Sequence, residues 1–80
     1  GGIVSLRLPR ATGEQVLRAL KRVGWYEHHH TGSHLFLRHA DRPGMRVDIP
    51  IHRGKTLKPK TLARIIESAG LTVEEFVDLL

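Results

Sequence analysis

The sequence predicts a small α+β domain in which two main helices cover one face of a three-stranded antiparallel sheet. Apolar residues recur at helical spacing in residues 12–24 and again in residues 59–70. Between these segments lie three short strand-like runs separated by turn residues. Both helices need apolar cover, so the order helix, three strands, helix and short final helix indicates a two-layer sandwich. At 80 residues, the chain is expected to form one domain, residues 1–80.

The first helix is predicted to begin at Thr12, because Thr12-Gly13-Glu14-Gln15 has the pattern of a capping box. Four apolar residues follow at helical spacing and are expected to face the sheet. Gly24 is expected to end the helix, because glycine is favoured just past a helix C-terminus. The four apolar residues are Val16, Leu17, Leu20 and Val23.

The three strand-like runs differ in how clearly they alternate, the third having apolar residues at every second position. Asp41-Arg42-Pro43-Gly44 is predicted to form the turn between the last two strands. Pro50 cannot donate a hydrogen bond to a neighbouring strand, which favours a free edge for the third strand. Trp25, which opens the first strand, is expected in the core. The predicted strands are residues 25–30, 33–39 and 45–51.

Two more helices complete the predicted order. Pro59 favours the start of the second helix, and Gly70 favours its end. Thr72-Val73-Glu74-Glu75 is a second capping-box pattern, and a short final helix is expected to run to Leu80. The residues of the second helix expected to face the core are Leu62, Ile65, Ile66 and Ala69.

The composition divides the chain into a basic body and an acidic tail. The chain has 13 Lys and Arg against 8 Asp and Glu, a net charge of +5. Residues 67–80 hold four of the acids and no base, so residues 1–66 have 13 bases and 4 acids, a net charge of +9. This asymmetry favours a nucleic-acid partner over an ordinary solvated surface.

The composition also excludes several classes of protein. The absence of cysteine excludes disulfides and thiolate metal sites. No apolar run approaches membrane-spanning length and no signal peptide is visible, so a cytoplasmic protein with no membrane partner is expected. Gly1-Gly2, without an initiator methionine, is consistent with a remnant of an expression vector.

The segment Thr31-Gly32-Ser33-His34 lies at the predicted turn between the first two strands. Its small residues leave space around His34, which is expected at an edge of the sheet, and histidine suits proton transfer near neutral pH. Further along the chain, three lysines surround the start of the second helix, where the helix dipole adds to the attraction for phosphate. This combination predicts chemistry on nucleic acid; the alternative is an inert histidine beside ordinary surface charge. The lysines are Lys55, Lys58 and Lys60.

RNA as a substrate would supply its own nucleophile, the 2′-hydroxyl group. Cleavage then needs a base, cations that stabilise the phosphorane and a proton for the leaving oxygen, with no cofactor. His34 is the candidate base, and Lys55 and Lys58 are the candidate phosphate ligands. His52, at the end of the third strand, is the candidate second proton carrier; the alternative is a solvated residue at a strand end.

The run His28-His29-His30 supports a rival chemistry. On a strand, His28 and His30 are expected to share one face with a spacing suited to zinc, and His34 or His52 could complete a three-histidine site. No acidic residue is placed as an obvious supporting partner. We therefore expect no functional metal, and a small histidine-ligated metalloenzyme is the alternative.

Several motifs, taken in order over residues 12–79, resemble the HicA family of toxins. The most specific is Gly32-Ser33-His34. Two departures are the run His28-His29-His30, where the family usually has a mixed apolar and basic stretch, and Lys60, where glycine is common. The other matching motifs are Gly24-Trp25, Val47-Asp48-Ile49-Pro50-Ile51-His52, Leu57-Lys58-Pro59-Lys60-Thr61-Leu62, Ile66-Glu67-Ser68-Ala69-Gly70-Leu71 and Val73-Glu74-Glu75-Phe76.

The resemblance implies the fold of a double-stranded-RNA-binding domain, which the predicted order of elements also matches. It implies the toxin of a toxin–antitoxin pair, a ribonuclease that cuts messenger RNA and is neutralised by a HicB-like antitoxin. Its essential residue is the histidine of the Gly-Ser-His motif, here His34. Charge predicts that the antitoxin covers His34 and the Lys55–Lys60 segment with an acidic surface. The alternative is a non-catalytic RNA-binding module of the same fold.

Overall fold

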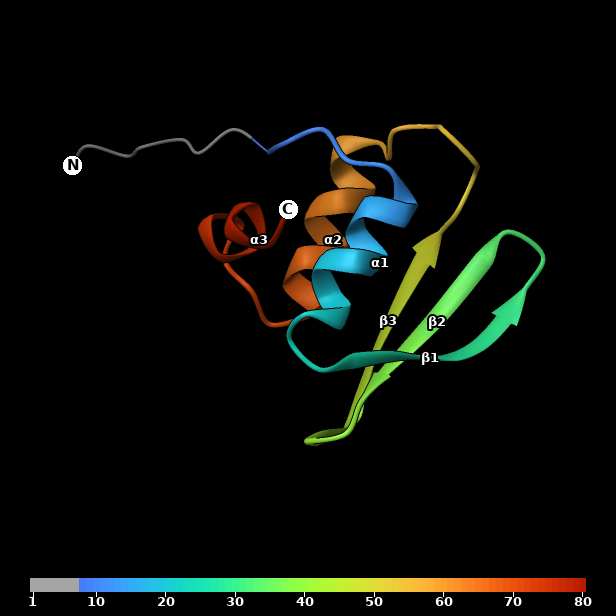
Figure 1. Ribbon diagram of the computed structural model, residues 1–80, viewed down its shortest axis with the longest axis vertical. Helices are drawn as coiled ribbons and strands as arrows, with labels where there is room; N and C mark the ends of the chain where they lie inside the picture. The colour runs from blue at the N-terminus through green and yellow to red at the C-terminus, as the bar shows by residue number, and fades with distance from the viewer. Residues whose placement is uncertain (1–7) are drawn as a thin grey trace.

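Three helices and a three-stranded sheet make up residues 8–80, the part of the chain that the computed structural model describes (Figure 1). The predicted α+β class and the predicted order of elements are confirmed. The interpretation of Gly1-Gly2 lies outside the described residues. In chain order the elements are α1 (Gly13–Lys21), β1 (Trp25–Thr31), β2 (His34–His39), β3 (Arg42–Pro50), α2 (Pro59–Ser68) and α3 (Val73–Leu79).

The helices and the sheet form two layers (Figure 1). α1 contacts β1 and β3, α2 contacts β3, and α3 packs against the two other helices rather than against the strands. The core lies between the layers, and Trp25 is part of it at 3% exposure, as predicted. No helix within residues 8–80 is long and apolar enough to cross a membrane. The largest fully buried side chains are Val16, Leu20, Leu37, Val47, Ile49, Leu62, Ile65 and Phe76.

The sheet is a meander with strand order β1-β2-β3 and antiparallel neighbours. β3 is an edge strand, as Pro50 predicted. β2 is the central strand, and its pairing places Leu35 opposite Ile49 and Leu37 opposite Val47. These four side chains are buried. Because side chains alternate along a strand, the residues between them point to the opposite face.

The first helix begins as predicted but ends earlier. Thr12 caps α1, and both hydrogen bonds of the capping box are present. The helix ends at Lys21, so Val23 lies outside it and is 36% exposed instead of facing the sheet. Gly24 follows with φ +101, a conformation that turns the chain toward β1 and that other residues rarely adopt.

The predicted turn between the last two strands is wrong. The sequence predicts a turn at Asp41-Arg42-Pro43-Gly44, but the chain turns at Ala40-Asp41 and β3 begins at Arg42. The pairing of β2 and β3 is irregular after Arg38. Pro43-Gly44 is therefore accommodated in a bulge on an edge strand, where the missing N–H of proline interrupts no regular pairing.

The last two helices follow the sequence prediction closely. α2 begins at Pro59, and Gly70 lies two residues after its end with φ +73. Thr72 caps α3 with a second complete capping box. The four residues predicted to face the core from the second helix are all buried, and they are Leu62, Ile65, Ile66 and Ala69.

Candidate active site

The face of the sheet that is turned away from the helices carries the candidate site. Along β2, Leu35 and Leu37 face the helices, whereas His34, Phe36 and Arg38 face the other way. We call this second surface the open face, and its side chains come from all three strands. They are Tyr26, His29 and Thr31 of β1, His34, Phe36 and Arg38 of β2, and Arg46, Asp48 and Pro50 of β3.

His34, the first residue of β2, forms a hydrogen-bonded pair with Asp48 of β3. Nδ1 of His34 lies 3.1 Å from Oδ1 of Asp48, and the two side chains are 50% and 48% exposed. A carboxylate only accepts hydrogen bonds, so Nδ1 carries the hydrogen and donates it. In the neutral ring the lone pair is then on Nε2, which has no hydrogen-bond partner within residues 8–80. The pair presents an oriented imidazole with a free basic nitrogen to solvent.

Asp48 is a candidate functional residue that the sequence prediction missed. The alternation of the third strand places Asp48 on the open face, but the pattern alone does not say which side chain it meets. The strand register decides this, because Pro50 lies opposite His34 and Asp48 lies opposite Phe36, diagonally across from His34. Asp48 could therefore be predicted as the hydrogen-bond partner of His34 only once the register between β2 and β3 was known.

The setting of His34 also differs from the prediction in one respect. His34 lies on the central strand rather than at an edge of the sheet, because β1 and β3 flank β2. Its exposure comes from the uncovered face and from the preceding turn, in which Gly32 has φ +52 and an added Cβ would meet nothing within 4 Å. The expected open space beside His34 is present.

The lysines at the start of α2 are exposed, but the structure does not join them to His34. Lys58 is the N-cap residue of α2 and makes no side-chain capping hydrogen bond, and Lys55 and Lys60 lie on either side of it. In the described chain the side chain of His34 bonds to Asp48 alone. The lysines are therefore a separate cationic surface, which we call the α2 basic segment (Lys55–Lys60).

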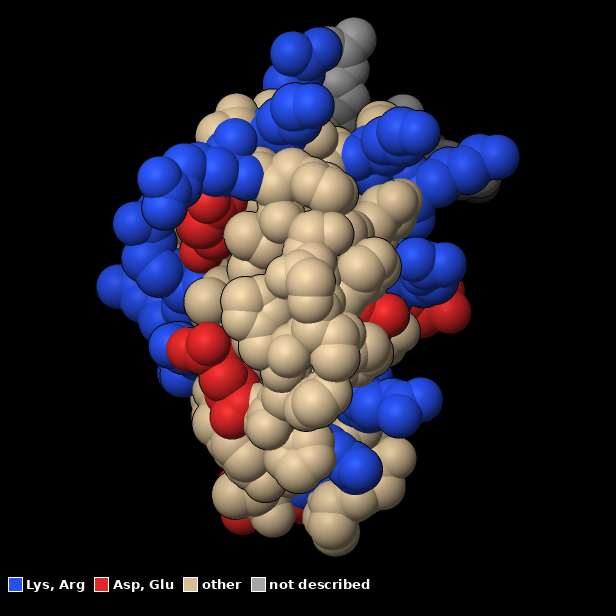
Figure 2. All heavy atoms as spheres, turned by 90° about the vertical axis from the view of Figure 1, so that its right-hand side faces the viewer, with Lys and Arg blue, Asp and Glu red and all other residues tan. Residues whose placement is uncertain are grey.

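The chain that leads from β3 to the α2 basic segment is held to the turn that precedes His34. The N–H of Ile51, the first residue after β3, donates to the carbonyl of Ser33 at 2.6 Å, just before the start of β2. Lys and Arg side chains gather at the upper end of the molecule in Figure 2, the end where Figure 1 places this segment and the start of α2. His52 precedes this segment in the chain, is exposed, and accepts the N–H of Lys55 at its backbone carbonyl at 2.9 Å.

The histidine run of β1 does not form the predicted two-histidine face. The strand has a bulge at His28, because the pairing shifts between Glu27 and His29. His28 and His29 therefore both border the open face, whereas His30 lies opposite the buried Leu35 and points to the helix side. The expectation that His28 and His30 share a face is wrong. Within residues 8–80, no group of three histidine, cysteine or acidic side chains is arranged to hold a metal ion.

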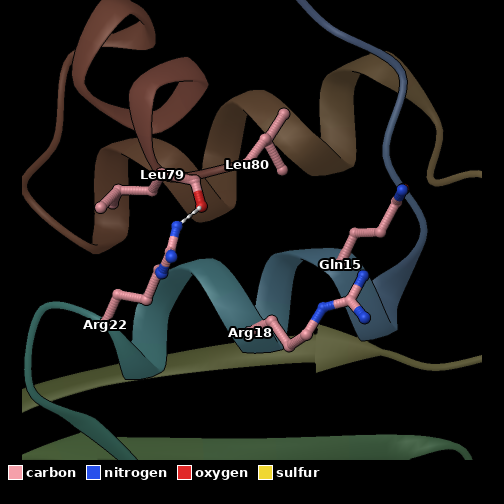
Figure 3. Close-up of a pocket in the computed structure, with 5 residues that line it drawn as sticks. All are labelled: Gln15, Arg18, Arg22, Leu79 and Leu80. Atoms are coloured by element: carbon pink, nitrogen blue, oxygen red, sulfur yellow. Dashed lines mark hydrogen bonds between the residues drawn. The ribbon is translucent and has the colours of Figure 1, made fainter.

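A separate hollow of about 520 Å³ lies between α1 and the end of α3 (Figure 3). Gln15 and Arg18 come from α1, and Arg22 is its C-cap residue. Arg22 donates to the carbonyl of Leu79 at 3.2 Å on the opposite wall, beside Leu80. No histidine or carboxylate is among the described side chains that line it. This hollow therefore offers no proton carrier, and the candidate base, His34, lies instead on the open face.

A known protein family matches most of the chain. A family model described as the HicA toxin of bacterial toxin–antitoxin systems matches residues 13–71. The chain belongs to the HicA toxin family. The HicA match contains Gly32-Ser33-His34, Asp48 and the α2 basic segment, and it ends at Leu71, before α3 begins. Family membership assigns the chain a toxin role in a toxin–antitoxin system. No curated protein matches the chain.

Proposed function

We propose that this HicA-family toxin is a metal-independent endoribonuclease that cleaves messenger RNA in the cytoplasm, with His34 as its catalytic residue. The hydrogen bond between His34 and Asp48 is the observation that supports the proposal most. A surface that only binds RNA gains little from a carboxylate that fixes the tautomer of an imidazole, whereas a general base needs its free nitrogen oriented. The pair therefore favours an enzyme over a non-catalytic RNA-binding module.

In this mechanism His34 removes the proton of the 2′-hydroxyl group with Nε2. The 2′-oxygen attacks the adjacent phosphorus, the bond between phosphorus and the 5′-oxygen breaks, and a 2′,3′-cyclic phosphate forms. Asp48 stabilises the positive charge that the imidazole gains, because its carboxylate accepts the Nδ1 hydrogen throughout. No metal or cofactor enters these steps.

Two further groups have roles in the same scheme. The α2 basic segment (Lys55–Lys60) holds the RNA backbone, with the unpaired N–H groups at the start of α2 adding to the attraction for phosphate. The leaving 5′-oxygen needs a proton, and His52 is the side chain proposed to deliver it. These assignments give the exposed cations and the second histidine separate tasks, binding and leaving-group protonation.

A HicB-like antitoxin is proposed to silence the toxin by covering this same region. Residues 1–66 carry a net charge of +9, which attracts an acidic surface. An antitoxin that binds only the folded toxin also stabilises it, which matters for a domain of 80 residues with a small core. We treat residues 1–80 as one toxin domain in this scheme.

The nucleophile provides the test of the proposed activity. The purified protein is incubated with an RNA that it cleaves and with the same RNA carrying one 2′-deoxy substitution at the cut site. We expect no cleavage at the substituted position, products ending in a cyclic phosphate, and an unchanged rate when a chelator is added. Cleavage of the deoxy substrate at the normal rate, or loss of activity with chelator, would instead support a metal-activated water.

A further inference from the structure

The open face holds a second feature that the proposed cleavage chemistry does not use. The strand register arranges its side chains in two rows across the sheet, with His29 opposite Phe36 and, one row further along, Arg38 opposite Arg46. A hollow of about 230 Å³ lies among these rows, and its lining combines aromatic rings with cations. The residues that line it are His28, His29, Phe36, Arg38 and Arg46.

The aromatic row has the properties of a stacking surface for a base. The ring centroids of His29 and Phe36 are 5.9 Å apart, and their planes differ by 32°. The bulge at His28 brings a third ring to the same hollow. Proteins bind the unstacked bases of single-stranded RNA on aromatic side chains of this kind, next to cations that hold the backbone.

The cationic row is unfavourable unless an anion lies between its members. Arg38 and Arg46 are directly opposite each other on adjacent strands, where like charges repel. Nε of Arg38 is buried and has no hydrogen-bond partner among the described residues. A phosphate between the two guanidinium groups offsets their repulsion, because their exposed nitrogens bind its oxygens with charge-assisted hydrogen bonds.

We propose that this hollow is a subsite for one nucleotide of the single-stranded RNA substrate, next to the cleavage site. The base stacks on His29 and Phe36, and the phosphate is held by Arg38 and Arg46. The proposal rests on the proposed ribonuclease function and defines how its substrate is held. It also gives the bulge in β1 a function, because the bulge is what turns two consecutive histidines toward one face.

The spacing along β2 fits this arrangement. Alternate residues of a strand are about 7 Å apart, so the rows of His34, Phe36 and Arg38 follow one another at intervals that an extended nucleotide strand can match. The carboxylate of Asp48 is engaged by His34, at the catalytic end. The phosphate of the subsite therefore lies at the other end of the hollow, where the charge is positive.

The test measures RNA binding without cleavage. In a His34→Ala background, the affinity for a short single-stranded RNA is measured at several salt concentrations by fluorescence anisotropy. Arg46→Ala is expected to weaken binding several-fold and to reduce the salt slope by about 0.7. Phe36→Ala is expected to weaken binding about five- to a hundredfold. Arg18→Ala, which removes the same charge from α1 in the helical layer, is the matched control and is expected to leave the slope unchanged.

A second measurement separates stacking from a general loss of structure. RNAs that lack the base at one position are bound to the proteins with and without Phe36→Ala. At one position next to the cut, removal of the base is expected to abolish the difference between the two proteins. A difference that persists for every base-free RNA would overturn the stacking assignment.

The outcomes distinguish this proposal from the proposed function. If the wild-type protein does not cleave RNA but binding depends on Phe36 and Arg46 as described, the subsite holds and the nuclease assignment fails. If the protein cleaves RNA but both variants bind it like the Arg18→Ala control, the subsite is wrong and the nuclease stands. Variants that lose antitoxin binding while keeping RNA binding would assign the hollow to a protein partner and also overturn the proposal.

Discussion

The two ends of β2 carry histidines in opposite environments. His34 begins the strand on the open face, half exposed, with one ring nitrogen bonded to Asp48 and the other without a partner in the described chain. His39 ends the same strand on the helix side and is 9% exposed. The two residues are five positions apart on one strand, so the difference arises from the face they occupy and from what covers it.

Both ring nitrogens of His39 are engaged in holding the fold. Nδ1 accepts the N–H of Asp41 at 3.1 Å, so Nε2 carries the hydrogen and donates it to the carbonyl of Val23 at 2.7 Å. The ring also meets Trp25 edge-on, with centroids 5.3 Å apart. A Cβ added at Gly24 would lie 2.5 Å from Nε2 of His39, so the turn before β1 is packed onto this ring. His39 therefore connects two turns to the core and has no nitrogen left for substrate.

The hydrogen bonds around each ring, and not the residue type, distinguish the proposed catalytic histidine from the structural one. His39 donates to a carbonyl that is fixed by the fold, and a change of protonation at Nδ1 would break its bond to Asp41. His34 donates to a carboxylate and keeps Nε2 without a partner in the described chain, whereas both nitrogens of His39 are bonded within the fold.

The largest expected effect is that of His34→Ala on catalysis. We expect RNA cleavage and growth arrest to be abolished, because no other described side chain occupies the position of Nε2. The change in stability is expected to stay within about 0.5 kcal/mol, since the side chain is half exposed and its one ion pair is near the surface. Cleavage assays and urea unfolding on the same preparation measure both. Full activity in this variant would refute the assignment.

Asp48→Ala is expected to reduce kcat about 10²- to 10⁴-fold and to leave KM nearly unchanged. Asp48 is a positioning residue, and its removal frees the ring of His34 to rotate and removes the charge that stabilises the imidazolium. Asp48→Asn keeps the shape of the side chain, but its amide can donate to Nδ1 and favour the wrong ring tautomer, so this variant should lose at least as much activity as Asp48→Ala. Steady-state kinetics of the two variants decide the point. Equal and undiminished kcat values would show that the pair has no catalytic role.

Lys58 is expected to act on binding rather than on the chemical step. Lys58→Ala should weaken RNA binding across sequences and reduce the salt slope by about 0.7, with kcat unchanged at saturating RNA. Lys58→Glu should weaken binding of both RNA and antitoxin, because the two are proposed to compete for the α2 basic segment. Titration of each ligand against the two variants gives the measurement. If RNA still binds when the toxin is saturated with antitoxin, the proposal that the antitoxin covers the RNA-binding surface is wrong.

His39→Ala is expected to give the smallest effect on chemistry, although it lowers stability. Loss of two hydrogen bonds from a nearly buried ring should destabilise the protein by about 1–3 kcal/mol. Cleavage per folded molecule should stay close to that of the wild type. Urea unfolding and cleavage assays in parallel with His34→Ala separate the two roles. A stable His39→Ala protein without activity would show that His39, and not only His34, is needed for cleavage.

The fold could be predicted from the sequence because the signals that set its helices act between residues close together in the chain. Capping boxes at Thr12 and Thr72, Pro59 at a helix start and apolar spacing along each helix all act within a few residues. The exposure of His34 was also predictable, because it depends on the small residues of one turn. These features do not require knowledge of which strands meet in which register.

The arrangement of the site was not predictable because it depends on two local irregularities. A hairpin folded symmetrically about Arg42 and Pro43 would place Asp48 opposite Leu37, whereas the actual turn and bulge place it opposite Phe36 and on the side of His34. In β1, the bulge at His28 breaks the alternation on which the predicted metal site depended. A shift of one residue moves a side chain to the other face of a sheet, so neither pairing could be deduced from spacing alone.

Chemical rescue of His34→Ala is the most direct test of whether the imidazole ring of His34 is the catalytic base. The variant leaves a space at the exposed start of β2 beside Asp48, and free imidazole supplies the missing ring. Without imidazole we expect no cleavage. With increasing imidazole we expect cleavage at the wild-type position, at a rate that rises with the imidazole concentration. The double variant with His34→Ala and Asp48→Ala should not be rescued to the same rate. Cleavage by His34→Ala at the wild-type rate without imidazole would show that His34 is not the catalytic base.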